Sequence, residues 1–106
     1  MKEFLIVETR DAADQRGPER MARLAAGLSR GGVKATILLA ENGVFSARRG
    51  GDGLAAAMRD GVAVAVDRFA LEERAVRSES LAEGVAAATV DLVVDRLAAG
   101  ACVIWR

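Results

Sequence analysis

The sequence predicts one α/β domain spanning residues 1–106, with a mainly parallel sheet of four to five strands and helices on both faces. Two observations support this prediction. Short, β-rich apolar runs alternate along the chain with segments whose apolar residues recur at helical spacing. The connections between these segments are short, and a strand–helix alternation with short connections is typical of a parallel sheet. The length suits a single hydrophobic core.

Four apolar runs are the predicted strands, at residues 4–7, 33–39, 62–66 and 101–105. The first run is apolar at every position, as expected for a strand that is covered on both faces. The third run alternates valine with alanine. A sheet covered on both sides is the middle layer of a three-layer, flavodoxin-like fold, which is the fold class that we predict.

The first predicted helix begins at Pro18, because proline fits the first turn of a helix, and it ends before the glycine pair at 31–32. Its core-facing stripe is predicted from helical spacing to be Met21, Leu24, Ala25 and Leu28. A second helix is predicted over 54–60, and a brief helical turn over 71–76.

A longer helix is predicted over residues 83–99, directly before the last strand. Its core-facing stripe is predicted to be Val90, Val93, Val94 and Leu97. Leu92 lies off this stripe, so we expect it to contact another subunit. Gly100 ends the helix.

The composition limits the chemistry. Fifteen Lys and Arg balance fifteen Asp and Glu, so no net charge favours nucleic acid or an anionic membrane surface. Without histidine and with a single cysteine, the common zinc sites, histidine-dependent catalysis and an internal disulfide are excluded. No apolar run approaches the roughly 20 residues of a membrane span, and the first residues do not read as a signal peptide. We predict a cytoplasmic protein with no metal and no cofactor, and with neither nucleic acid nor membrane as a partner.

Several short motifs follow one another through the middle of the chain. A glycine pair precedes the second strand, and Gly43-Val44 follows it. The third strand then runs from Gly61 to Asp67, with Leu71 and Arg74 in the next turn. In the order and spacing of these motifs the chain resembles, over nearly its whole length, the DsrE/DsrF-like family, which includes the TusD, TusC and TusB subunits of bacterial sulfur relay.

The resemblance implies the fold described above and a role related to sulfur relay. The chain differs from the family at the position of the reactive cysteine. Active members have a reactive cysteine at the end of the third strand, where this chain has Asp67, and a serine where it has Ala70. A thiolate carries sulfane sulfur and a carboxylate does not. We therefore predict a divergent member that lacks the family cysteine. We lean toward a protein without enzymatic activity. The family also implies homo-oligomers or pairing with paralogous DsrE-like subunits.

Candidate binding residues come from the carboxyl ends of the predicted strands, because open parallel sheets bind ligands at that edge. The predicted pocket is lined by Arg10, Asn42, Asp67, Arg68, Arg74 and Trp105. No residue is assigned a catalytic role. For Asp67 a structural alternative stays open, in which the aspartate caps the following helical turn. Residues 48–53 are predicted to be an exposed loop, since they lack the ending of a phosphate-binding P-loop.

Three functions remain in competition. The first is a non-catalytic, oligomeric binding or assembly subunit related to intracellular sulfur relay, and it is preferred. The second is a small-molecule or anion-binding protein that uses the strand-end pocket. The third is a sulfurtransferase that uses Cys102. This residue begins the last strand, at the edge opposite the predicted pocket, and we expect it to be a small core residue.

Overall fold

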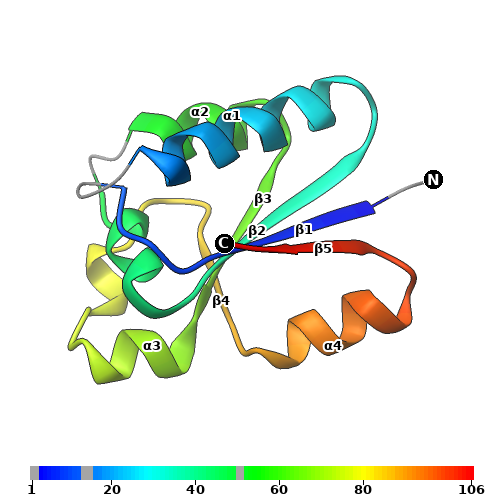
Figure 1. The fold of residues 1–106 in the computed structure, drawn as a ribbon. Coiled ribbons are helices and arrows are strands. Elements are labelled where there is room, and N and C mark those ends of the chain that lie inside the picture. Colours follow the sequence, from blue (N-terminus) through cyan, green and yellow to red (C-terminus); the bar gives the residue numbers. More distant parts are fainter. Residues whose placement is uncertain (1–2, 13–15, 50–51) are drawn as a thin grey trace.

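Figure 1 shows the computed structural model, which describes residues 3–12, 16–49 and 52–106. The described residues form one parallel sheet with the strand order β4-β3-β2-β1-β5. Its strands are β1 (Glu3–Glu8), β2 (Lys34–Leu39), β3 (Ala63–Asp67), β4 (Ala86–Ala88) and β5 (Cys102–Trp105). The predicted three-layer, flavodoxin-like α/β fold is confirmed.

Helical segments connect the strands. They are α1 (Gly17–Arg30), η1 (Glu41–Ala47), α2 (Asp52–Arg59), α3 (Arg68–Glu73), η2 (Ser78–Ser80) and α4 (Asp91–Ala98), where η denotes a 3₁₀ helix. Helices α1 and α2 lie on one side of the sheet, and α3 and α4 lie on the other (Figure 1). We call the two sides the α1 face and the α4 face. None of the helices described is long and apolar enough to cross a membrane.

The strands alternate between the two faces, as the pleat of a strand requires. Ile6, Ile37 and Val64 belong to the core of the α1 face. Leu5 and Leu38 belong to the core of the α4 face. Because both sides of the central strands are covered, the apolar runs of the sequence are continuous.

The segment 83–99 is not a single helix, contrary to the prediction. Gly84 has a φ of +91°, a left-handed conformation that glycine adopts without strain. Ala86–Ala88 then form β4, and α4 begins only at Asp91. Alanine favours helix in isolation. Here the pairing of β4 with β3, which sets Ala88 beside Asp67, overrides that preference.

Helix α1 turns the predicted side toward the sheet except at Leu24, since Ala25 is buried and Met21 and Leu28 pack on the α1-face core. Helix α4 turns a different side toward the sheet from the one predicted. In α1 the buried residues are Pro18, Ala22, Ala25 and Ala26, whereas Leu24 is 43% exposed. In α4, Leu92 and Val93 pack on the α4-face core. The other three residues of its predicted stripe, Val90, Val94 and Leu97, are exposed. Leu92 is thus a core contact rather than the predicted subunit contact.

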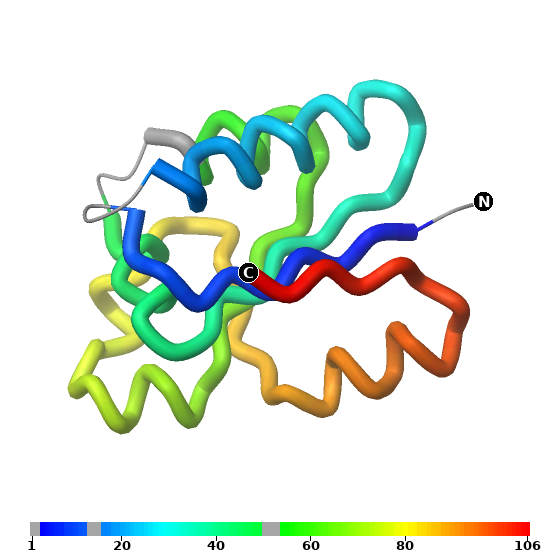
Figure 2. Tube along the Cα trace, viewed as in Figure 1, coloured from blue at the N-terminus to red at the C-terminus, as the bar shows by residue number. Residues whose placement is uncertain are grey.

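The chain passes along the carboxyl edge of the sheet between α3 and β4, as the yellow tube in Figure 2 shows. There it pairs with the segment that follows η1. The backbone N–H of Arg49 donates to the Ser80 carbonyl at 2.9 Å, and the N–H of Ala82 donates to the Ala47 carbonyl at 2.8 Å. These bonds tie η2 to the end of η1, beside the carboxyl ends of the central strands.

Candidate functional site

The carboxyl ends of the strands align along one edge of the sheet, as predicted, but the residues there divide between its two faces. The register sets Glu8 beside Leu39 and Leu39 beside Val66. Glu8 shares the α1 face with Ile6, because residues two apart point to the same side of a strand. Asp67 shares the α4 face with Ala65 by the same rule.

The six predicted pocket residues do not form one cluster. Two of them are joined directly, since Arg74 Nε donates to Asn42 Oδ1 at 3.0 Å and so links the end of α3 to η1. Arg74 also lies 3.6 Å from the Glu73 carboxylate. The Arg10 side chain bonds to Glu8 on the α1 face.

Of the other three predicted residues, Asp67 and Arg68 are consecutive at the junction of β3 and α3, and Trp105 ends β5. Asp67 is buried, Arg68 is exposed at the start of α3, and Trp105 is 59% exposed at the end of β5. Strands β3 and β5 are separated by β2 and β1. At a spacing of about 4.8 Å per strand, Asp67 and Trp105 are therefore roughly 14 Å apart across the sheet.

The capping role considered for Asp67 is not realised. Asp67 occupies the position before the first residue of α3, with an extended backbone, but its side chain makes no capping hydrogen bond. Within the described part of the chain its carboxylate also has no ion-pair partner. It is a buried acid at the strand end where the resemblance places a cysteine.

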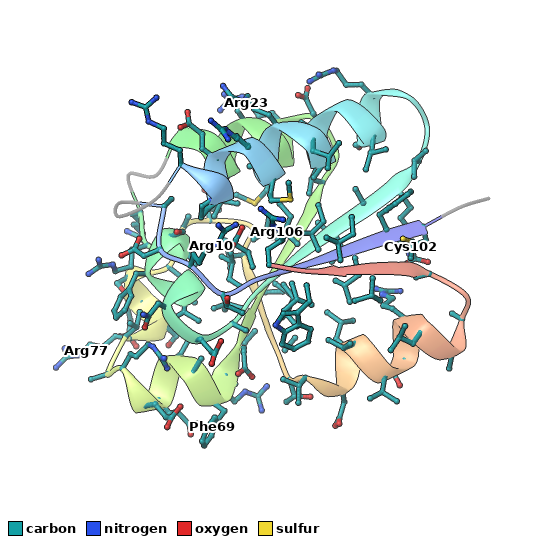
Figure 3. The ribbon with its side chains drawn as sticks, viewed as in Figure 1. Arg10, Arg23, Phe69, Arg77, Cys102 and Arg106 are labelled. Atoms are coloured by element: carbon teal, nitrogen blue, oxygen red, sulfur yellow. The ribbon has the colours of Figure 1, made fainter. Side chains whose placement is uncertain are left out.

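Cys102 is exposed, so the prediction that it is a core residue is wrong. The reason is topological, since β5 is an edge strand and Cys102 is its first residue. Its predicted position in the sheet is confirmed. Cys102 pairs with Phe4 near the amino end of β1, and Figure 3 shows it at the end of the sheet away from Arg10.

A cavity of about 790 Å³ opens on the α1 face at the carboxyl edge. We call it the α1-face cavity. The end of β1, the first turn of α1, η1, α2 and η2 all contribute to its wall. None of the six predicted pocket residues lines it. The cavity therefore lies at the same edge of the sheet as the predicted residues but is lined by others.

Glu8 lies in the wall of the α1-face cavity and is only 2% exposed. Its Oε2 accepts hydrogen bonds from the backbone N–H and the Nε of Arg10, both at 3.2 Å. Figure 3 shows Arg10 beneath the start of α1. Within the described residues, Glu8 Oε1 is buried and has no hydrogen-bond partner. The sequence carries a signal for this residue, since it is an acid at the end of a wholly apolar strand.

Two glycines make room for this pair. A Cβ at Gly17 would lie 2.5 Å from both terminal nitrogens of the Arg10 guanidinium. A Cβ at Gly43 would collide with the backbone carbonyl of Glu8. Gly43 belongs to the Gly-Val turn that follows β2, so this turn is glycine-dependent because it packs directly on the end of β1.

Arg48 and Arg49 also line the α1-face cavity. Both side chains are exposed, as predicted, but each is held in place. Arg48 Nε donates to the Phe45 carbonyl at 3.3 Å, and its guanidinium carbon lies 5.2 Å from the centroid of the Phe45 ring. Arg49 Nε donates to the Leu81 carbonyl at 3.3 Å. The rest of the predicted loop lies partly outside the described residues, at 50–51, and α2 begins at Asp52.

The acidic and thiol side chains were considered as metal ligands. In the part of the chain that the structure describes, no group of three or more such side chains is arranged to hold a metal ion. Glu8 and the two arginines offer the α1-face cavity hydrogen bonding and charge pairing, and its apolar residues offer apolar contact.

No family model and no curated protein matches the sequence. Solved structures match it over its length. One is the ychN protein from E. coli, with a TM-score of 0.86, 20% identity and full coverage of both chains. Another is the protein of unknown function MTH1491 from Methanobacterium thermoautotrophicum, with a TM-score of 0.79, 17% identity and full coverage of both chains. A third is BT1422 from Bacteroides thetaiotaomicron, also of unknown function, with a TM-score of 0.77, 17% identity, and coverage of 99% of this chain and 95% of that one. The chain has the same fold as these three proteins.

Proposed function

We propose that this protein is a non-catalytic, DsrE/DsrF-like subunit that assembles with a second copy of itself, in a role related to intracellular sulfur relay. The observation that supports assembly is the outer side of α4. Val90, Val94 and Leu97 recur there at i, i+4 and i+7, and they are 52%, 64% and 56% exposed. We call these three residues the α4 stripe. An apolar row of this kind on a helix favours packing against another helix.

Trp105 adds to the apolar surface on the same side of the sheet. Val103, two residues before it on β5, packs in the α4-face core, so the indole also projects toward the α4 face. Trp105 is more than half exposed. Exposed apolar surface of this size on one side of a small domain favours an interface, and tryptophan is a frequent anchor of such interfaces.

A second copy is the partner that we propose. The chain has no net charge, so two copies do not repel each other through their overall charge. When the α4 stripe of one copy packs on the α4 stripe of a second copy across a twofold axis, the same surface is used by both. Most homodimers are built on a self-complementary contact of this kind. Pairing with a paralogous subunit is the alternative outcome of the test below.

The absence of sulfur-transfer chemistry is the other half of the proposal. The residue at the family's cysteine position is Asp67, and the single thiol, Cys102, lies at the far end of the sheet. A carboxylate at the strand end supplies no atom on which sulfane sulfur can be carried. The resemblance to sulfur-relay proteins therefore supports a binding or assembly role rather than transfer.

Size-exclusion chromatography with light scattering tests the proposal. At high micromolar concentration the protein is expected to elute with at least twice the mass of one chain. Val94→Asp places a charge in the α4 stripe and is expected to give a monomer. Leu24→Asp is the matched control, because Leu24 is an exposed leucine on α1, and it should leave the mass unchanged. A monomeric unmodified protein would contradict self-assembly and would leave a paralogous subunit as the partner to be sought.

A further inference from the structure

The α1-face cavity has no role in assembly through α4, and its dimensions are those of a binding site. Its volume of about 790 Å³ lies within the range of small-molecule sites, which is roughly 300–1,000 Å³. Apolar side chains from α1, β2 and α2 form much of its wall: Met21, Ala22, Ile37, Leu39 and Leu54. This wall suits a ligand with an apolar body.

The wall also presents a buried acceptor. Glu8 uses one carboxylate oxygen for both of its bonds from Arg10, and the other, Oε1, has no partner within the described residues. Buried polar atoms in native proteins are normally hydrogen-bonded, because desolvation without a partner is costly. Glu8 lines the cavity, so a donor group on a ligand is the natural partner for this oxygen.

The two arginines supply the opposite charge. In each of them Nε bonds to a backbone carbonyl, which fixes the guanidinium at the cavity. Neither arginine forms an ion pair with an acidic side chain among the described residues. Their terminal N–H groups are suited to a carboxylate, which guanidinium groups bind with strong, charge-assisted hydrogen bonds.

The charges in the wall disfavour a purely anionic ligand. Among the described residues the acidic side chains that line the cavity are Glu8, which is paired with Arg10, and Asp11, Glu19 and Glu79, and the basic ones are Arg48 and Arg49. A ligand with only negative charge would be repelled by this excess of carboxylates, and one with only positive charge would leave the arginines unused. A ligand that carries both charges matches both sets.

We propose that the α1-face cavity binds a small zwitterion with an apolar body, of the chemical class of the apolar α-amino acids. Its ammonium group donates to Glu8, its carboxylate accepts from Arg48 and Arg49, and its side chain packs on the apolar wall, where Met21 and Leu54 are partly exposed and Ile37 and Leu39 are buried. This assignment is independent of assembly, because the cavity and the α4 stripe lie on opposite faces of the sheet.

Methyl NMR titration of the whole protein tests the proposal with three related probes. L-phenylalanine carries both charges, 3-phenylpropionate lacks the ammonium group, and 2-phenylethylamine lacks the carboxylate. L-phenylalanine is expected to shift the methyl signals of Ile37 and Leu39 in a saturable way. The methyl signals of Leu5, on the other face of the sheet, should not move. Each truncated probe is expected to bind about tenfold more weakly or worse, as for the loss of one charge-assisted contact.

Variants assign the two charges to their partners. Glu8→Gln should remove the preference for L-phenylalanine over 3-phenylpropionate. Arg48→Ala combined with Arg49→Ala should remove its preference over 2-phenylethylamine. Arg23→Ala, on the outer side of α1 in Figure 3, is the charge-matched control and should bind as the unmodified protein does.

The double arginine variant changes only exposed side chains, so it decides the matter even where Glu8→Gln fails to fold. Three results would overturn the proposal: no saturable shift at Ile37 and Leu39 with L-phenylalanine, equal affinity for all three probes, or preferences that the variants leave unchanged. None of these results bears on the oligomeric mass, so the test is separate from that of assembly.

Discussion

The two faces of the sheet are covered unequally. Among the described residues the core cluster that contains the α1 face has fifteen buried members and the α4-face core has five. The larger cluster lies beneath α1 and α2 and extends to η1 and to Ala70 and Leu71 of α3, so it holds most of the apolar burial that stabilises the fold. Helix α4 contributes no fully buried residue and leaves its apolar stripe in solvent. One face thus holds most of the core and the cavity, while the other leaves apolar surface exposed, for which we propose a partner.

The largest expected effect is a core deletion on the α1 face. Ile37→Ala removes a side chain that is 2% exposed and is expected to lower the free energy of unfolding by about 2–5 kcal/mol. The comparison is Leu92→Ala on the α4 face. This change should lower the free energy of unfolding by clearly less, because Leu92 is only half-buried. Urea unfolding, with both changes made in the monomeric Val94→Asp background, measures the two losses. Equal losses would contradict the unequal cover of the faces.

The second effect concerns the turn that packs on the end of β1. Gly43→Ala drives a Cβ into the Glu8 carbonyl and is expected to destabilise the protein by about 1–3 kcal/mol. Gly27→Ala is the matched control, since a Cβ there meets only Arg30 Nη2 at 3.8 Å. Because Gly27 lies within α1, Gly27→Ala should stabilise the protein by about 0.5–1 kcal/mol. In thermal melting the midpoint temperature should fall for Gly43→Ala and rise for Gly27→Ala. An unchanged midpoint for Gly43→Ala would refute the close contact.

A smaller effect is expected at the pair formed by Arg10 and Glu8. Gly17→Ala brings a Cβ against the Arg10 guanidinium, the flexible end of a side chain, which can move aside. We expect a modest loss of stability together with weaker L-phenylalanine binding, because Glu8 loses its orienting partner. Arg10→Lys should reproduce the weaker binding without the steric change. Full binding by both variants would show that the pair does not orient Glu8.

Chemical modification of Cys102 is expected to have almost no effect on either face. The exposed thiol should react fully with iodoacetamide in the folded protein, as intact mass would show. Because Cys102 lies at the amino end of β5, the modified protein should keep its oligomeric mass and its L-phenylalanine binding. A folded protein that resists alkylation would contradict the exposed position of this residue.

Much of the fold could be predicted from the sequence, because the signals were local. The apolar runs at 4–7 and 33–39 and the proline at 18 mark β1, β2 and the start of α1 within a residue or two. The exception was 83–99, where three alanines favour helix by themselves. They form a strand because β3 offers an edge with which they can pair, and that is a contact between residues distant in sequence.

The side that α1 turns to the sheet could be predicted except at Leu24, whereas the side that α4 turns to the sheet could not. Helix α1 packs through alanines, which permit close approach to the sheet, so its large Leu24 is turned to solvent. Helix α4 packs through Leu92 and Val93, although its regular apolar spacing lies elsewhere. Periodicity indicates that a helix has an apolar row, but not whether that row meets the domain's own core or a partner.

The cavity lies at the predicted edge of the sheet, but residues other than the predicted ones line it. Asp67 ends β3 on the α4 face, whereas Arg10 bonds to Glu8, which ends β1 on the α1 face. The cavity depends instead on Glu8 and on Arg48 and Arg49. The backbone bonds between η2 and the end of η1 hold Arg49 beside this cavity, and no local sequence pattern predicts that pairing.

The most direct test of the separate roles of the two faces is a pair of measurements on Val94→Asp, namely its mass by light scattering and its L-phenylalanine titration at the Ile37 methyl groups. We predict the mass of one chain and an affinity equal to that of the unmodified protein. A mass that stays oligomeric would contradict assembly through the α4 stripe. A monomer that no longer binds L-phenylalanine would contradict the independence of the two faces.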